Sequence, residues 1–136
     1  MQTGATRLAG RILRTAAIVA LLTGCGSGCS GRSEAYGEPI DETAPIPLKD
    51  LLADLPADRE ESITVSGTIG TICRTSGCWL TLRDLTGEEP VEIFVDLQGA
   101  SFSAPAGSEL KNAIIVGKLV GDEPDLAIHA AGLVVK

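Results

Sequence analysis

The sequence contains few of the residues from which active sites are usually built. Its 136 residues include one histidine, His129, and one methionine, Met1. Because histidine is the commonest general acid–base residue, little catalysis of that kind is expected. There is no glycine-rich phosphate loop and no serine–histidine–aspartate arrangement, and paired glutamates such as Glu88-Glu89 fall in turn-like segments. We therefore expect a protein that is not an enzyme and that has no catalytic residues and no cofactor.

Aromatic side chains and positive charges are also scarce. The chain has one tryptophan, one tyrosine and two phenylalanines, whereas a groove that stacks bases normally needs several aromatic rings. Its 18 Asp and Glu against 11 Lys and Arg give a formal charge of −7. Since an acidic domain repels phosphate backbones, we expect no nucleic-acid partner.

The first residues have the features of an export signal. Arg7, Arg11 and Arg14 make the start positive, and the apolar run from Ala16 to Leu22 is seven residues long. That run is far too short to span a bilayer, but it suits the apolar region of a secretory signal. Residues 1–24 are therefore predicted to be removed on export.

The segment Leu22-Thr23-Gly24-Cys25 resembles a bacterial lipobox. Lipoproteins are cut before this cysteine, which is then acylated, so residues 1–24 are predicted to be a lipoprotein signal peptide and Cys25 the lipidation site. Two or three acyl chains anchor a protein stably in a membrane. We expect a cell-envelope protein facing the periplasm or the exterior, and Gly26, in place of aspartate, favours the outer membrane of a Gram-negative host. An ordinary secreted protein with a chance cysteine is the alternative.

Residues 25–35 are rich in glycine and serine, which predicts a flexible membrane tether. Within it, Cys29 is a second lipid site, a free thiol or a residue without a role. Residues 36–136 form the folded domain. Its first regular element is a short helix, because Leu48, Leu51, Leu52 and Leu55 form one apolar stripe after Pro47.

Apolar and polar residues alternate through most of the remaining sequence, which predicts strands. Five strands are expected, at residues 62–73, 78–83, 91–95, 112–120 and 125–135. An open sheet of five strands would leave two exposed edges, so closure is favoured. We predict an all-β domain with one short helix, folded as a small five-stranded antiparallel barrel of the oligonucleotide/oligosaccharide-binding (OB) type. A small sandwich is the alternative, since the usual OB helix lies between strands three and four.

Two cysteines flank the tip of the first predicted hairpin. If residues 74–77 form its loop, Cys73 lies opposite Cys78 and Ile72 lies opposite Trp79. Both cysteines then point toward the core, while Trp79 and Ile72 point to the outer face. A one-residue bulge at Gly77 would break this register.

Cysteines opposite each other on neighbouring strands are within disulfide range, so Cys73 and Cys78 are predicted to form a structural disulfide. A reversible redox pair and a Cu(I) or Zn(II) site remain the alternatives. The register places His129 on the outer face, away from both cysteines, and no methionine remains after export. We therefore assign no metal site, although two thiolates alone suit Cu(I).

Trp79 is the candidate ligand contact of this hairpin. Outward tryptophans on barrels serve as stacking platforms for sugars, bases or aromatic ligands. The alternative is that Trp79 packs under the amino-terminal segment or against Tyr36.

The stretch Cys-Arg-Thr-Ser-Gly-Cys-Trp resembles the Cys-x-x-x-Gly-Cys-Trp signature of a bacterial family known as domain of unknown function 4920. The matching residues are Cys73, Gly77, Cys78 and Trp79. The resemblance covers residues 36–135 and implies an exported OB-like barrel, without implying an activity. Where family members have a longer segment with histidine and acidic residues before the last strand, this chain has only residues 121–124, which argues against a shared metal site.

Together these features predict a lipid-anchored, extracytoplasmic binding or accessory module without catalysis, whose partner is an envelope protein or a small ligand. The first alternative is a thiol redox or Cu(I)/Zn(II)-handling protein that uses Cys73 and Cys78. The second is an oligosaccharide binder that uses Trp79.

Overall fold

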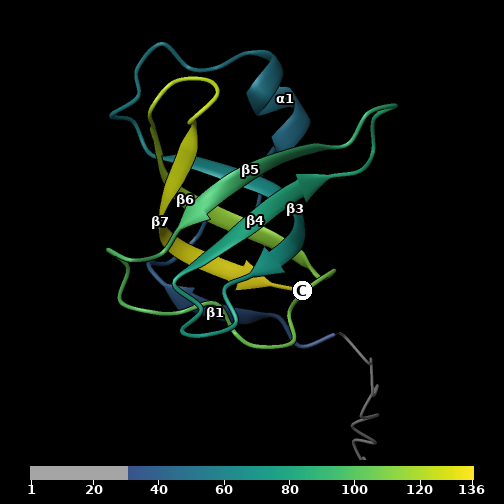
Figure 1. Ribbon diagram of the computed structural model, residues 1–136, viewed down its shortest axis with the longest axis vertical. Coiled ribbons are helices and arrows are strands. Elements are labelled where there is room, and N and C mark those ends of the chain that lie inside the picture. Colours follow the sequence, from purple (N-terminus) through teal and green to yellow (C-terminus); the bar gives the residue numbers. More distant parts are fainter. Residues whose placement is uncertain (1–30) are drawn as a thin grey trace, which may run out of the picture.

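Five strands of the chain close into a barrel (Figure 1). The computed structural model describes residues 31–136, so the predicted signal peptide, Cys25 and Cys29 lie outside the described residues. The barrel strands are β3 (Ile63–Ile72), β4 (Trp79–Asp84), β5 (Val91–Asp96), β6 (Asn112–Val120) and β7 (Ala127–Val135). All five lie within one or two residues of the segments in which apolar and polar residues alternate.

The pairing of these strands makes a closed ring. β3 pairs with β4, β4 with β5, β5 with β7, β7 with β6, and β6 with β3. This confirms the small OB-like barrel. One detail of the prediction is wrong: β5 and β7 run parallel, while the other four pairs are antiparallel. The parallel pair arises because β6 crosses to pair with β3, and β7 returns to close the ring beside β5.

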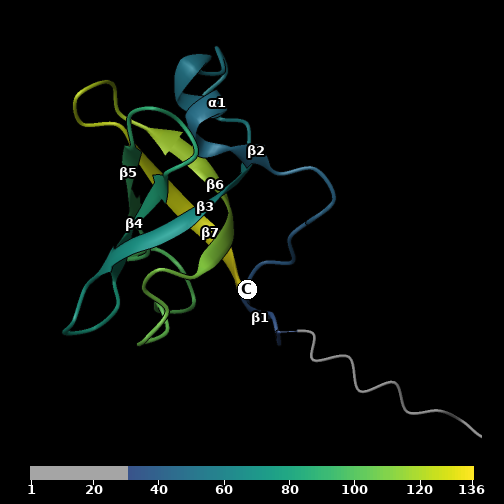
Figure 2. The same cartoon turned by 90° about the vertical axis from the view of Figure 1, so that its right-hand side faces the viewer.

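Three short elements lie outside the ring. β1 (Glu34–Gly37) pairs with β7, and β2 (Ile46–Pro47) pairs in parallel with β3. Helix α1 (Leu48–Ala53) lies at one end of the barrel in both views (Figures 1 and 2). Within the described residues, no helix is long and apolar enough to cross a membrane.

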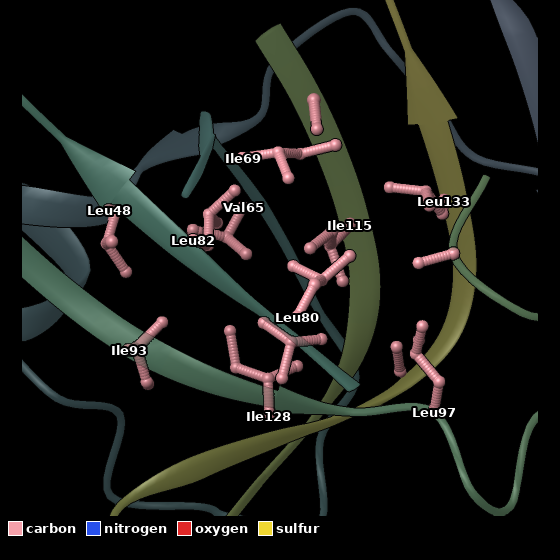
Figure 3. Close-up of a cluster of buried hydrophobic side chains, with 14 of the residues drawn as sticks. Leu48, Val65, Ile69, Leu80, Leu82, Ile93, Leu97, Ile115, Ile128 and Leu133 are labelled. Atoms are coloured by element: carbon pink, nitrogen blue, oxygen red, sulfur yellow. The ribbon is translucent and has the colours of Figure 1, made fainter. Parts of the chain in front are cut away.

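The barrel is filled by inward-pointing aliphatic side chains (Figure 3). Along β4, burial alternates residue by residue, so Leu80 and Leu82 are fully buried while Trp79 and Thr81 are half-buried on the other face. Leu48 of α1 is also fully buried and closes one end of this core. The predicted leucine stripe is therefore confirmed, although the helix ends at Ala53 rather than near residue 55.

Asp84 fastens α1 to the barrel. It is 6 % exposed, and its Oδ2 accepts the backbone N–H of Lys49 in the first turn of the helix at 3.2 Å. Its Oδ1 accepts the backbone N–H and the hydroxyl of Thr86 at 2.9 and 2.6 Å. The hydrogen bonds from Thr86, followed by that from Lys49, lower the pKa of this carboxyl below its ordinary value. The last residue of β4 thus satisfies a backbone donor that α1 cannot satisfy itself.

Candidate functional site: a dithiol loop

The β3–β4 loop is closed by backbone hydrogen bonds. The Cys73 N–H donates to the Trp79 carbonyl at 3.0 Å, and the Gly77 N–H donates to the Cys73 carbonyl at 3.0 Å. Gly77 has a φ of +62°, and a Cβ there would lie 2.7 Å from the Ala104 carbonyl oxygen. The loop therefore requires glycine at position 77, both for its backbone conformation and for its contact with the segment after β5.

The register of this hairpin changes partway along β3. Near its base, Ile69 lies opposite Leu82, as predicted. Closer to the tip, Ile72 lies opposite Leu80 rather than Trp79, because a bulge intervenes between Ile69 and Ile72. Ile72 is consequently turned inward and is 5 % exposed, so its predicted place on the outer face is wrong.

The bulge forms on β3, at Gly70 and Thr71, and not at Gly77. The Thr71 N–H donates to Thr81 Oγ1 at 2.9 Å, which replaces a hydrogen bond of the ladder. A Cβ on Gly70 would lie 2.5 Å from that same oxygen. The hydroxyl of Thr81 and the bare backbone of Gly70 together fix the bulge at this position.

Both cysteines lie at the rim of the barrel. Cys73 and Cys78 are half-buried, and neither is part of the buried core. Cys73 follows the inward-facing Ile72 and so loses its predicted place on the core face, whereas the bulge leaves the alternation of β4, and with it the predicted face of Cys78, unchanged. Their proximity is as predicted: the two sulfur atoms lie 3.6 Å apart as free thiols, with the Cys78 thiol donating to Cys73 Sγ. A disulfide between them stays a prediction.

The loop stabilises negative charge on Cys73. The backbone N–H of Ser76, followed by that of Thr75, lowers the pKa of the Cys73 thiol to about 6. The Cys78 thiol and the Ser76 hydroxyl, whose oxygen is 3.8 Å from Cys73 Sγ, contribute further. At neutral pH Cys73 is therefore mostly a thiolate, which is the nucleophilic form of cysteine.

A cavity of about 340 Å³ lies beside this thiolate. The hairpin loop forms one wall, and Ala104, Ala106 and Glu109 from the segment after β5 line the other. Two backbone hydrogen bonds join the walls: the Ala104 N–H donates to the Gly77 carbonyl, and the Leu97 N–H donates to the Cys78 carbonyl, both at 2.9 Å. The cavity therefore leaves Cys73 accessible beside small side chains.

Trp79 lies on the outer face of β4, as predicted, and pairs with a second aromatic residue. Its ring lies 5.6 Å from that of Phe94 on β5, at an interplanar angle of 32°. Phe94 is 43 % exposed. Tyr36 does not pack on Trp79 but stacks on Phe102, with ring centroids 6.2 Å apart.

Polar residues continue this outer face across β5 and β7. Asp96 lies opposite Trp79 on one side and opposite His129 on the other. His129 is exposed, and its Nε2 lies 3.6 Å from Asp96 Oδ2. The prediction that His129 points outward is confirmed. In the part of the chain that the structure describes, no three His, Cys, Asp or Glu side chains are grouped to hold a metal ion.

Sequence reasoning missed the residues that lower the pKa of the Cys73 thiol and the second aromatic residue beside Trp79. The backbone donors of Thr75 and Ser76 leave no signature, because any residue type supplies an N–H. Phe94 did leave a signal: it alternates with the inward-facing Ile93 and Val95 and so belongs on the same outer surface as Trp79.

No family model matches this chain, and no curated protein matches its sequence. Its function must therefore be argued from the geometry of the loop and of the barrel surface.

Proposed function

We propose that this chain is an envelope-anchored dithiol module that exchanges its thiols with disulfides outside the cytoplasm. The observation that carries the proposal is the Cys73–Cys78 pair, with its sulfur atoms 3.6 Å apart and Cys73 lining a cavity. The lowered pKa of Cys73 adds to it. An acyl group on Cys25 and the tether after it would hold the domain at the membrane. Disulfide substrates persist in that compartment.

The exchange takes two steps. The Cys73 thiolate attacks one sulfur of a partner's disulfide; that S–S bond breaks, a mixed disulfide forms, and the partner's other sulfur leaves as a thiolate that takes up a proton. Cys78, after losing its proton to solvent, then attacks Cys73 Sγ and releases the partner's second thiolate. Two electrons have passed to the partner, and Cys73 and Cys78 end as a disulfide. The reverse sequence oxidises a partner's dithiol.

The contacts around Cys73 favour this reading over a permanent structural disulfide. Hydrogen bonds to the thiolate stabilise the reduced state of the pair, and stabilising the reduced state makes the corresponding disulfide easier to reduce. A structural clip gains nothing from such donors. Handling of Zn(II) gets less support, because the described residues bring no third ligand to the two sulfurs. Two thiolates alone suit Cu(I), so Cu(I) handling stays an alternative.

The test is the thiol state of the protein taken from its native envelope. Intact mass, measured with and without alkylation, should show that mild reductant increases the number of alkylated thiols by two, and it also reports acylation of Cys25. The rate of Cys73 alkylation should reach half its maximum near pH 6. A disulfide that resists mild reductant and does not exchange would refute this function and leave the structural disulfide in its place.

A non-catalytic binding module is the second candidate, supported by the outward pairing of Trp79 with Phe94. The apolar C–H face of a sugar ring suits such rings, and Asp96 and His129 offer hydrogen bonds beside them. We therefore assign an oligosaccharide as the ligand. Titration with a panel of oligosaccharides should change the fluorescence of Trp79, and Phe94→Leu should weaken that response. Silence across the panel would count against this candidate.

A further inference from the structure

Positive charge is concentrated on one face of this acidic barrel. The sequence has 11 Lys and Arg, of which three precede residue 31, so the described residues hold eight, together with all 18 Asp and Glu. Five of the eight line two adjoining cavities that share Lys136. We call these five residues the cationic face: Arg32, Lys49, Arg83, Lys111 and Lys136.

The cationic face is one continuous surface. Arg83 on β4 lies opposite Thr68 on β3, and Thr68 lies opposite Asn112 on β6. The Lys136 N–H donates to the Asn112 carbonyl at 2.8 Å, and Lys111 precedes Asn112 in the chain. The larger of the two cavities, about 590 Å³, lies over this row of residues.

Four carboxylates accompany the cationic face, and they leave it positive. Glu34 and the buried Asp84 line its cavities. Glu42 pairs with Lys136 at 2.8 Å, and Glu92 pairs with Arg83. Counting side chains alone, the face has one excess positive charge, whereas the rest of the described barrel has three cations against 14 carboxylates. Exposed ion pairs such as these contribute little stability, so the two cations can exchange their glutamates for other anions.

The carboxylates elsewhere on the barrel do not cancel this local charge. At physiological ionic strength the electrostatic interaction decays over about 8 Å. A domain of this length has a radius of gyration of about 13 Å, so its far side lies well beyond that distance. An anion approaching the cationic face therefore meets mainly the charges of that face.

The chain enters the barrel beside this face. β1 pairs with β7 so that Glu34 lies opposite Val135, and Gly31 and Arg32 line the same cavity as Lys111 and Lys136. Cys25 precedes Gly31 by six residues, which span about 20 Å at most. An acyl anchor at Cys25 therefore keeps the cationic face close to the bilayer surface.

We propose that the cationic face docks on the anionic phospholipid headgroups of the membrane that anchors the chain. The inference rests on the anchor proposed above, and it adds a second, electrostatic contact to the acyl chains. Each basic residue near an anionic surface strengthens the association about fivefold. In Figure 2 the β3–β4 loop lies at the lower left, away from β1 and the end of β7, so docking leaves the dithiol open to partners.

The test uses the native acylated protein in vesicles of phosphatidylcholine, with or without phosphatidylglycerol. Lysines are labelled with an amine-reactive reagent, and the rate at each residue is read by mass spectrometry. We expect Lys111 and Lys136 to react about fivefold more slowly when phosphatidylglycerol is present, and high salt should restore the rate. Lys118 is the matched control, because it also pairs with a glutamate, Glu60, at 3.3 Å but lies outside the cationic face.

A pair of double variants completes the test. Lys111→Gln/Lys136→Gln should abolish the protection of Lys49, whereas Arg74→Gln/Lys118→Gln should leave it intact. Equal protection of Lys118, or equal rates in both kinds of vesicle, would overturn the proposal. If protection grows with protein density in pure phosphatidylcholine, the cationic face binds a second copy of the chain and not the headgroups. That result would also overturn the proposal. Intact mass reports acylation of Cys25 separately, so failure of the anchor and failure of docking give different results.

Discussion

Anionic groups lie near both ends of β4, and they are held in the same way. Asp84, the last residue of the strand, accepts backbone N–H groups from Thr86 and Lys49. Cys73, in the loop before the strand, receives those of Ser76 and Thr75. In both places, hydrogen-bond donors lower the pKa of the group by stabilising its charged form.

The two anions differ in what surrounds them. Asp84 is 6 % exposed and has a helix packed above it, so its charge is used to hold α1 in place. Cys73 lies at a rim, beside a cavity and 3.6 Å from a second thiol, so its charge is available for reaction. Hydrogen bonds thus stabilise the anion, whereas access and a neighbouring reactant decide whether its role is structural or chemical.

The largest expected effect is the loss of exchange on removing the reactive sulfur. Cys73→Ser should abolish reaction with a disulfide such as glutathione disulfide, because no other described thiolate faces the cavity. Cys78→Ser should instead accumulate a mixed disulfide on Cys73, since the second step is blocked. Intact mass distinguishes the two outcomes. A mixed disulfide that formed on Cys78 in the Cys73→Ser variant at the normal rate would contradict the assignment of Cys73 as the nucleophile.

Replacing the structural anion, Asp84, should lower stability and leave thiol exchange unchanged. Asp84→Ala removes the acceptor for Lys49 and Thr86 and should lower the free energy of unfolding by about 1.5–3 kcal/mol, the range for hydrogen bonds to a charged group. Urea unfolding measures this change. The control is Asp50→Ala, because Asp50 is an exposed acidic residue in the first turn of α1, next to Lys49. At urea concentrations below its unfolding midpoint, the Asp84→Ala variant should exchange thiols as the unaltered protein does. A lower exchange rate under these conditions would mean that the two ends of β4 are coupled.

The two anions should also titrate in separate windows. The lowered pKa of Asp84 means that its contribution to stability is full above its ordinary value of 3.8 and is lost as pH falls through the folded value. For Cys73 the folded pKa of about 6 lies below the ordinary 9.0, so stability of the reduced protein should rise between pH 6 and 9. Urea midpoints measured across pH test this, and Cys73→Ser should remove only the upper window.

The barrel was predictable because its signal is local and repeated. Alternation along segments such as Ile63–Ile72 and Trp79–Asp84 reflects which face of a strand is buried, and residue type alone shows this. The same logic placed Trp79 and His129 outside. The parallel pairing of β5 with β7 was missed because it depends on how the ring closes, which no single strand encodes.

The dithiol loop was only partly predictable. Two glycines near the hairpin tip, Gly70 and Gly77, are equally suited to a bulge by residue type. The choice between them depends on the hydroxyl of Thr81, ten residues after Thr71 in the chain, which accepts its N–H. A shift of one residue reverses the direction of a side chain, so the bulge turned Ile72 inward and Cys73 away from the core face.

The smallest expected effect separates the backbone donors from the side chain that accompanies them. Ser76→Ala removes the hydroxyl 3.8 Å from Cys73 Sγ but keeps the Ser76 N–H, which is the larger cause of the lowered pKa. The midpoint of Cys73 alkylation should therefore rise only slightly from about pH 6. Thr75→Ala, which keeps its N–H and loses no contact to the sulfur, is the matched control. A midpoint near the ordinary value of 9.0 in Ser76→Ala would mean that the hydroxyl, and not the backbone, charges this thiol.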